Sequence, residues 1–380
     1  MTSFSLITNS PVEICLPGHP DKICDQISDL ALDCILAEDI RARVAVETMI
    51  KNQQVTVSGE VTTTARHWVP RFYNAVEEMF DDLRLGVPDI KLNISQQSPQ
   101  IKGAVDSGFA GDQAIVYGYA IIGGEETNMM PVNHYKASLA AREITGLIVA
   151  SPELRFDGKV LFVPGNFVNG FVDELFVSVQ HTDAVAGELV RELVSDHLKE
   201  LDEFGPTVIY VNVGNDFIVG GAYADAGVTG RKIVADNYGP GYPVGGGAFS
   251  GKDLTKVDRL GAYLARDVAK EIASHGLVGV ESVKGLPLYV SAAYAYGIEG
   301  VVYADVGIIV PSTIDPHGKL GKFADDGECL LNKVYSRMSP SQASVDRMMA
   351  GYGRDWKFHM LASFGSFGAT ASLPVPWESV

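Results

Sequence analysis

The residues best suited to chemistry lie in a glycine-rich segment from Gly245 to Arg259. Glycines let backbone N–H groups approach a ligand closely, and a helix that follows them adds about half a positive charge at its first turn. Lys252, Lys256 and Arg259 stand at i, i+4 and i+7, so they would line one edge of a helix. The segment therefore predicts a site for a polyanion such as phosphate, and its alternative is an ordinary amphipathic helix with a solvated basic edge.

The same segment is not a P-loop, although Gly246 to Lys252 has the right spacing. Asp253 follows where that motif needs Ser or Thr to hold magnesium. We therefore reject the P-loop interpretation.

A second cluster is the run Gly18-His19-Pro20-Asp21-Lys22. Pro20 fits the first position of a helix, which places His19 at the helix start. An imidazole and a lysine there could bind phosphate, and Asp21 could bind the metal that accompanies phosphates. The alternative is a helix start at which His19 and Asp21 only cap exposed N–H groups.

Two further segments are ambiguous from their residues alone. A turn-rich stretch from Asp225 ends in the adjacent cations Arg231 and Lys232, which could equally be a solvated basic pair. Residues 96–113 are rich in polar and small residues and in glycine, which fits a lid over a ligand or a plain connector.

The elements that must position these groups follow from hydrophobic periodicity. Helical spacing predicts three long helices that begin near Pro20, Thr182 and Asp253. The apolar stripe of the second is Val185, Leu189, Leu193 and His197, and that of the third is Val257, Leu260, Leu264, Val268 and Ile272. Between the helices, hairpin-like strands are predicted at 43–51, 54–64, 160–163, 171–179, 208–213, 217–221, 286–295 and 301–310. This order favours a three-part α+β fold over one parallel doubly wound sheet.

Composition limits the classes of function. The chain has 380 residues, of which 46% are hydrophobic and 20% charged, and these values are typical of a soluble globular protein. A formal net charge of -17 argues against a nucleic-acid or anionic-membrane surface. The sequence shows no export signal and no long apolar run. Its four cysteines lack the spacing of disulfides or metal sites, so we expect a cytoplasmic protein with free thiols.

Four segments taken together, and in this order, resemble S-adenosylmethionine synthetase. They are Gly-His-Pro-Asp-Lys at 18–22, Gly-Asp-Gln at 111–113, Thr-Gly-Arg-Lys at 229–232 and Gly-Gly-Gly-Ala-Phe-Ser-Gly-Lys-Asp at 245–253. The resemblance extends from about Glu13 to Pro376-Trp377-Glu378. It implies three similar α+β domains with pseudo-threefold symmetry, which we place at 1–102, 103–222 and 223–380 with interleaved segments. It also implies a homodimer or homotetramer with active sites between subunits.

The resemblance further implies a reaction and its cofactors. The sulfur of L-methionine attacks C5′ of ATP and expels tripolyphosphate, which is then cleaved to pyrophosphate and phosphate. Such a site needs preorganised cations more than a base, because the thioether is already nucleophilic. Magnesium, with two ions per site, and potassium are the implied cofactors.

By match to the family pattern, the residues divide into four groups. Those expected to act on the phosphate chain and the leaving oxygen are His19, Lys159, Arg231, Lys232 and Lys252. Further ATP-binding positions are Asp112, Asp157, Phe217, Asp225 and Ala248. Methionine-binding positions are Glu60, Gln97, Asp225 and Lys256. Metal ligands are Asp21 and Asp258 for magnesium and Glu47 for potassium.

The chain also departs from the family pattern. Pro17 replaces an acidic residue, Gln100 replaces an aspartate, and Asp216 stands where an arginine precedes the site phenylalanine. The loop from Ile101 to Asp112 is several residues shorter, which could change lid closure, methionine affinity or tripolyphosphate hydrolysis. A catalytically silent homologue that serves as a binding or regulatory subunit, or another phosphate-handling enzyme, remain the alternatives.

Overall fold

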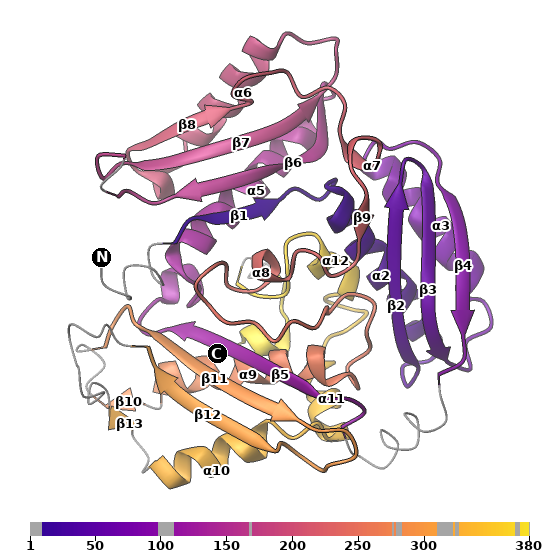
Figure 1. The fold of residues 1–380 in the computed structure, drawn as a ribbon, viewed down its shortest axis with the longest axis vertical. Coiled ribbons are helices and arrows are strands. Elements are labelled where there is room, and N and C mark those ends of the chain that lie inside the picture. Colours follow the sequence, from indigo (N-terminus) through magenta and orange to yellow (C-terminus); the bar gives the residue numbers. More distant parts are fainter. Residues whose placement is uncertain are drawn as a thin grey trace.

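The computed structural model describes residues 10–97, 110–166, 169–275, 277–278, 283–309, 322–323, 327–368 and 373–379. Within these residues three larger β-sheets surround a central region, and helices cover the far side of each sheet in the view of Figure 1. A small separate pair is formed by β10 (Leu277–Val278) and β13 (Lys322–Phe323). The predicted α+β class is confirmed.

The sheet at the right of Figure 1 has the order β4-β3-β2-β9. It consists of β2 (Arg43–Lys51), β3 (Gln54–Thr62), β4 (Asp89–Ser95) and β9 (Gly227–Val228). The hairpin predicted at 43–51 and 54–64 is confirmed, with β3 two residues shorter at its end. Alternate residues of β2 are buried on the side of helix α2 (Pro20–Leu36), which itself packs against α3 (Trp68–Asp82).

The upper sheet has the order β1-β6-β7-β8. It is built from β1 (Val12–Cys15), β6 (Leu154–Val163), β7 (Asp173–His181) and β8 (Thr207–Val211). Helix α5 (Val132–Ala150) packs on β6 and β1, and α6 (Gly187–Lys199) packs on β8. The pair β7–β8 is parallel, so the strands predicted at 171–179 and 208–213 do not form a hairpin. The pair β3–β4 is also parallel, and β4 was not predicted.

The predicted stripe of α6 is wrong by one position. The helix begins at Gly187 instead of near Thr182, and its buried residues include Val190, Val194 and Leu198. Leu189 and Leu193 are exposed. Both sets repeat every four residues, so the spacing alone could not tell which set faces the sheet.

The lower sheet has the order β12-β11-β5, with β5 (Ala114–Ile121), β11 (Pro287–Tyr294) and β12 (Tyr303–Ile308). Helix α9 (Val257–His275) crosses β5 and β11 so closely that a Cβ at Gly118 would collide with the backbone of Ala265. The predicted stripe of α9 is buried throughout. Helix α10 (Gly327–Arg337) packs against β12, and α11 (Gln342–Met348) packs against α9.

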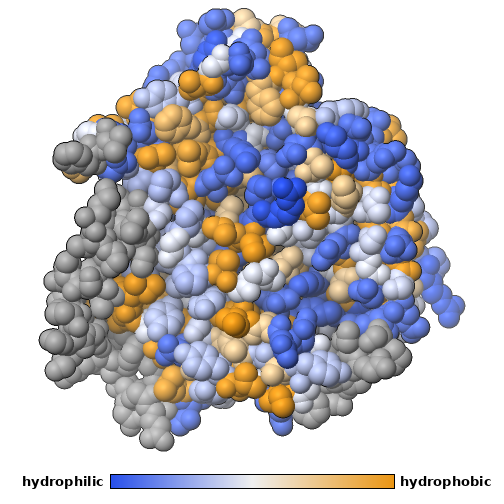
Figure 2. Space-filling model, viewed as in Figure 1, coloured by the Kyte–Doolittle hydropathy of each residue, from blue (hydrophilic) through white to orange (hydrophobic). Residues whose placement is uncertain are grey.

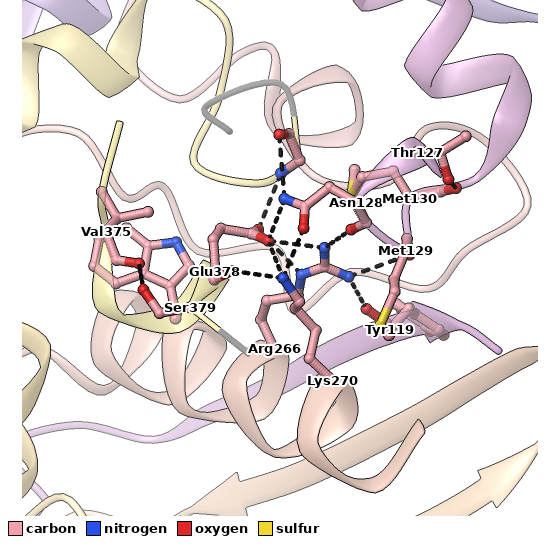
Figure 3. Close-up of polar contacts among 12 residues, drawn as sticks. Tyr119, Thr127, Asn128, Met129, Met130, Arg266, Lys270, Val375, Glu378 and Ser379 are labelled. Carbon is pink, nitrogen blue, oxygen red and sulfur yellow. Dashed lines mark hydrogen bonds and ion pairs between the residues drawn. The ribbon is translucent and has the colours of Figure 1, made fainter. Parts of the chain in front are cut away.

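The C-terminal segment is fastened to α9 by buried charges (Figure 3). In η5 (Pro376–Glu378), the Glu378 carboxylate lies 2.9 Å from Arg266 Nη2 and 3.2 Å from Lys270 Nζ. Arg266 also donates to the carbonyl of Asn128, which follows η1 (Glu125–Thr127). These contacts join segments far apart in the sequence.

Short elements occupy the centre and the edges of the fold. They are η2 (Asp202–Phe204), α7 (Gly221–Ala224), α8 (Ile233–Asp236) and α12 (Phe358–Ala362). The strand predicted at 217–221 is wrong, because residues 217–220 form no strand and Gly221 begins α7. The three consecutive apolar residues 217–219 lie in a loop, in which the Phe217 carbonyl accepts a backbone hydrogen bond from His181.

The sheets do not follow contiguous thirds of the chain. β1 joins the sheet of β6, β5 joins the sheet of β11, and β9 joins the sheet of β2. Segments therefore cross between the ranges 1–102, 103–222 and 223–380, and these bounds stay a prediction. Among the described helices, none is both long enough and apolar enough to cross a bilayer.

Candidate active site

The start of α2 organises the first part of the site. His19 is the N-cap residue, and its Nδ1 accepts a hydrogen bond of 3.1 Å from the backbone N–H of Asp21. The helix start at Pro20 is confirmed, and His19 caps the helix as its simpler interpretation expected. Asp21 does not follow that interpretation, because its carboxylate accepts hydrogen bonds from Val228 N–H and Lys232 Nζ. Because Nδ1 is the acceptor, a neutral ring carries its proton on Nε2, which remains a donor.

His19 is held neutral. It is 6% exposed, and burial, with the neighbouring Lys232 ammonium, lowers its pKa to about 4. At neutral pH this imidazole can therefore donate a hydrogen bond through Nε2 without carrying a charge.

Asp21 is the meeting point of the predicted cations. Its carboxylate accepts a short hydrogen bond from Lys232 Nζ and lies 3.5 Å from Arg231 Nη1. The backbone N–H of Val228 also donates to Asp21 at 3.0 Å. These contacts keep the pKa of Asp21 below its usual value despite the opposing effect of burial. The structure thus brings the 18–22 and 229–232 motifs together.

A second edge of this cluster comes from β6. Lys159 pairs with Glu13 at 3.2 Å, and the electrostatic influence of Lys159 reaches both His19 and Asp21. Asp157 accepts a hydrogen bond of 2.6 Å from the N–H of Gly221, and burial raises its pKa. Asp225 is exposed, four residues beyond Gly221.

The glycine-rich segment is arranged differently from the prediction. Helix α9 begins at Val257, so Lys252 and Lys256 precede the helix and the three cations do not share one helical edge. Lys252 Nζ lies 2.6 Å from Asp258, and Lys256 Nζ lies 2.9 Å from Asp253. Arg259 is 1% exposed, so it is not available to a ligand in this structure.

Arg259 instead forms part of a buried frame. It makes a bidentate pair with Asp29 of α2, at 2.7 and 2.9 Å, and Asp29 also accepts the N–H of Gly251 at 2.8 Å. The guanidinium carbon lies 4.1 Å from the ring centre of Phe358. The frame attaches the loop that carries Lys252 to α2, so Arg259 positions the site.

The metal and methionine candidates on β2 and β3 lie beside this loop. Ala45 bridges to Lys252 on one side and faces Glu60 across the hairpin on the other. Glu47 stands two residues further along β2, and both glutamates are exposed. In the view of Figure 1, a group of hydrophilic residues lies near the middle of the molecule, with hydrophobic patches around it (Figure 2).

The remaining candidates are placed as follows. Ala248 is half-buried, and a Cβ at Gly230 would stand 2.5 Å from its Cβ, so the 229–232 and 245–253 motifs touch. Gln97 is buried, and its Oε1 has no partner among the described residues. Asp112 is exposed and accepts the N–H of Gln113, whereas Phe217 is half-buried beside His181.

Of the departures from the family pattern, two can be located. The Pro17 carbonyl accepts a hydrogen bond of 2.8 Å from Gln26, and Asp216 lies 3.7 Å from Arg191 of α6. Gln100 and residues 101–109 of the shortened loop lie outside the described residues.

The sequence interpretation missed a set of buried charges on α2. Asp25 and Asp29 are buried, as is Lys22, whose Nζ bonds to Asp25 and to Asp236. Burial and the neighbouring Asp236 carboxylate, which shares the Lys22 ammonium, raise the pKa of Asp25 to about 7. A signal was present: aspartates recur every four residues at 21, 25, 29 and 33, which places them along one side of the helix.

The acidic side chains of the described residues do not gather into a ready-made magnesium site. None of their His, Cys, Asp and Glu side chains forms a group of three or more that could hold a metal ion. Magnesium in nucleotide sites is commonly bound through one or two carboxylates plus substrate phosphates. Asp21 and Asp258, each now paired with an ammonium, suit that chemistry.

In the part of the chain that the structure describes, small cavities border some of the predicted site residues, among them Asp157 and Asp258. A cavity of about 140 Å³ has Asp157 at its wall, together with Phe156 and Tyr223. A larger cavity of about 520 Å³, between α2, α3 and residues 357–359, contains none of the predicted site residues. The predicted site is therefore marked by converging charged side chains and not by a large cavity.

Comparison with known proteins agrees with this arrangement. Residues 8–106 match the profile of the S-adenosylmethionine synthetase N-terminal domain, and residues 219–378 match that of the C-terminal domain. A solved structure described as an unusual S-adenosylmethionine synthetase from Campylobacter jejuni has a TM-score of 0.81 to this chain. The match has 24% sequence identity and covers 97% of this chain and 96% of that one. The two domain matches and the shared fold show that this chain is a divergent member of the S-adenosylmethionine synthetase family.

Proposed function

We propose that this protein synthesises S-adenosylmethionine from ATP and L-methionine. The observation that carries the proposal is the convergence of Arg231 and Lys232 on Asp21, beside His19, with Lys252 on the adjoining loop. A site that expels tripolyphosphate must stabilise several negative charges on the leaving group. Family membership supports the same reaction class.

The reaction balances without a general base. A lone pair of the methionine sulfur forms the S–C5′ bond, the C5′–O5′ bond breaks, and its electron pair leaves with tripolyphosphate. Neutral His19 would donate a hydrogen bond through Nε2 to the departing oxygen, which gains charge as the bond breaks. Hydrolysis of the tripolyphosphate to pyrophosphate and phosphate would complete the turnover.

The cations would exchange partners when ATP binds. Lys232, Arg231, Lys252 and Lys159 are paired with the carboxylates of Asp21, Asp258 and Glu13 in this structure. The phosphate chain would take these cations, and Asp157, Asp225, Asp112, Phe217 and Ala248 would line the nucleotide. Methionine would be bound by Lys256, Glu60, Gln97 and Asp225.

The released carboxylates would then be free for metal. Asp21 and Asp258 would hold magnesium together with the substrate phosphates, and Glu47 would hold potassium. The ions would supply charge neutralisation to the phosphate chain. Mn²⁺ can replace magnesium, and its binding can be measured by electron paramagnetic resonance in the absence of turnover. We expect Mn²⁺ binding to require added tripolyphosphate and to be weaker in Asp258→Asn.

We further propose that two copies of the chain complete the site. Met49, Ile115 and Val208, on strands of three different sheets, are all exposed. Exposed apolar residues spread over sheet faces suit burial against a second copy. A symmetric pair would also let an exposed residue such as Asp112 of one copy approach the nucleotide site of the other.

A product assay tests the proposed reaction. Wild-type protein with ATP, methionine, magnesium and potassium should give S-adenosylmethionine, pyrophosphate and phosphate in equal amounts. Binding of ATP and methionine without product would identify a catalytically silent homologue. ATP consumption that does not depend on methionine would indicate another phosphate-handling enzyme.

A further inference from the structure

We propose that Lys22, Asp25 and Asp236 are positioning residues that hold Arg231 and Lys232 where the phosphate chain binds. The inference rests on the proposed function. It assigns a role to Asp25 and Asp236, which the sequence interpretation left without one, and replaces the phosphate-binding role considered for Lys22, whose side chain is 2% exposed and paired with both carboxylates. None of the three is placed against the substrate. They act through the segment that carries the two cations.

The centre of the arrangement is the buried ammonium of Lys22. Its Nζ lies 2.7 Å from Asp236 Oδ1 and 3.2 Å from Asp25 Oδ2. The side chains of Lys22 and Asp25 are each 2% exposed, and that of Asp236 is 20% exposed. A buried ammonium is tolerated only when paired, so both carboxylates are held close to it.

Both ends of the cation-bearing segment are attached to this centre. At one end, the N–H of Gly230 donates to Asp25 Oδ1 at 2.9 Å. At the other end, Asp236 closes the short helix α8, and its own N–H donates to the carbonyl of Lys232 at 2.9 Å. The backbone that carries Arg231 and Lys232 is therefore fixed on both sides to the first two turns of α2.

Such anchoring matters because the two cations must change partners. Arg231 is about half exposed, and its Nη1 lies 3.5 Å from Asp21 and donates to the Ala226 carbonyl at 3.3 Å. Both are long contacts, which a phosphate can replace. If the backbone were free to move, each phosphate contact would cost additional conformational entropy on binding. A fixed backbone lets the long side chains exchange Asp21 for phosphate without that cost.

Two variants loosen the anchor in different ways. Asp236→Ala detaches one end and leaves Lys22 paired with Asp25, so it should fold. Lys22→Met removes the ammonium from the centre, and if that protein fails to fold, Asp236→Ala alone carries the test. The matched control is Lys270→Met, because Lys270 is 3% exposed and also lies 3.2 Å from a carboxylate, that of Glu378, on a different part of the fold (Figure 3).

The measurement is the dissociation constant of inorganic tripolyphosphate with magnesium, obtained by calorimetry alongside thermal unfolding. We expect both anchor variants to weaken binding about tenfold, which corresponds to about 1.4 kcal/mol. Lys270→Met should lower the unfolding temperature but leave the dissociation constant within about twofold. Tripolyphosphate binding within twofold of wild type in Asp236→Ala would overturn the proposal.

A double-mutant cycle separates positioning from general damage. In a Lys232→Ala background, Asp236→Ala should weaken binding less than about threefold, because one of the cations it positions is already gone. A full tenfold loss in that background would show that Asp236 does not act through Lys232, and would also overturn the proposal. A wild-type protein that makes no S-adenosylmethionine would contradict the proposed function, whereas active wild type with unaffected variants would contradict only this inference.

Discussion

Lys252 Nζ and Asp258 Oδ2 lie 2.6 Å apart, which joins the glycine-rich loop to the first turn of α9. Each residue was assigned to a different part of the substrate complex, the lysine to phosphate and the aspartate to magnesium. Their pairing shows that the resting site is internally neutralised. When a magnesium–phosphate complex binds, this ion pair would be replaced by two others: the Lys252 ammonium would contact phosphate, and the Asp258 carboxylate would contact magnesium.

Removal of Lys252 should strongly reduce turnover. A preorganised charge-stabilising group is typically worth about 2.7 to 4 kcal/mol in the transition state, so Lys252→Ala should lower kcat by about 10² to 10³. Steady-state rates of S-adenosylmethionine formation measure the effect. An unchanged unfolding temperature should accompany the loss, and a rate within tenfold of wild type would contradict the assignment.

His19→Ala should cause a loss of similar size, about 10² to 10³ in kcat, through loss of the Nε2 donor. Because the pKa of His19 is about 4, the ring stays neutral across the assay range. The rate profile of wild type should therefore show no ionisation from this group between pH 6 and 8. A pKa near 6.5 that disappears in His19→Ala would refute the neutral-donor role.

His134 should make stability depend on pH. It is 1% exposed, its Nε2 lies 2.7 Å from the Ala235 carbonyl, and burial lowers its pKa from 6.5 to about 4. The unfolded state then binds the proton more tightly, so stability is complete above pH 6.5 and is lost as pH falls toward 4. Lowering the pH from 7 to 5 should therefore reduce the free energy of unfolding by about 2 kcal/mol through this group.

Urea unfolding of wild type and His134→Gln at both pH values tests that dependence. The variant should be less stable at pH 7, because it perturbs a buried contact, but its stability should change less between the two pH values. Equal pH dependence in both proteins would assign the effect to other groups.

Assembly should depend on the exposed sheet faces. Met49→Glu and Ile115→Glu add charge to strands β2 and β5, at side chains that are 53% and 55% exposed. If these faces meet a second copy, the double variant should shift the mass measured by light scattering from dimer to monomer and lose activity. Leu189→Glu, on the exposed side of α6, is the control and should leave the mass unchanged.

Much of the fold could be predicted from the sequence, because a helix or strand that is buried on one side has apolar residues at regular intervals. The hairpin at β2 and β3 and the stripe of α9 are examples. Leu189 and Val190 show the limit, since two apolar series with the same spacing compete and the sheet decides between them. The start of α9 at Val257 was also missed, because the bridge between Ala45 and Lys252 holds the preceding residues outside the helix.

The site could be predicted only in part. The cations and carboxylates of the motifs were identifiable by residue type, and Asp21, Arg231 and Lys232 do meet. The spacing of the residues could not show which cations form ion pairs inside the protein and are therefore unavailable to a ligand. Arg259 looked like a phosphate ligand, but Asp29 from α2 neutralises it, and only the three-dimensional fold brings those two residues together.

The central claim is that the chain transfers the adenosyl group to methionine with tripolyphosphate as the leaving group at the His19, Lys232 and Lys252 cluster. A single-turnover reaction, quenched early and resolved by mass spectrometry, tests it most directly in wild type and Lys252→Ala. We expect S-adenosylmethionine in amounts equal to tripolyphosphate plus pyrophosphate, and its formation should depend on methionine. In the variant it should form at least about 10² times more slowly. Phosphate released without S-adenosylmethionine, or equal rates in the two proteins, would contradict it.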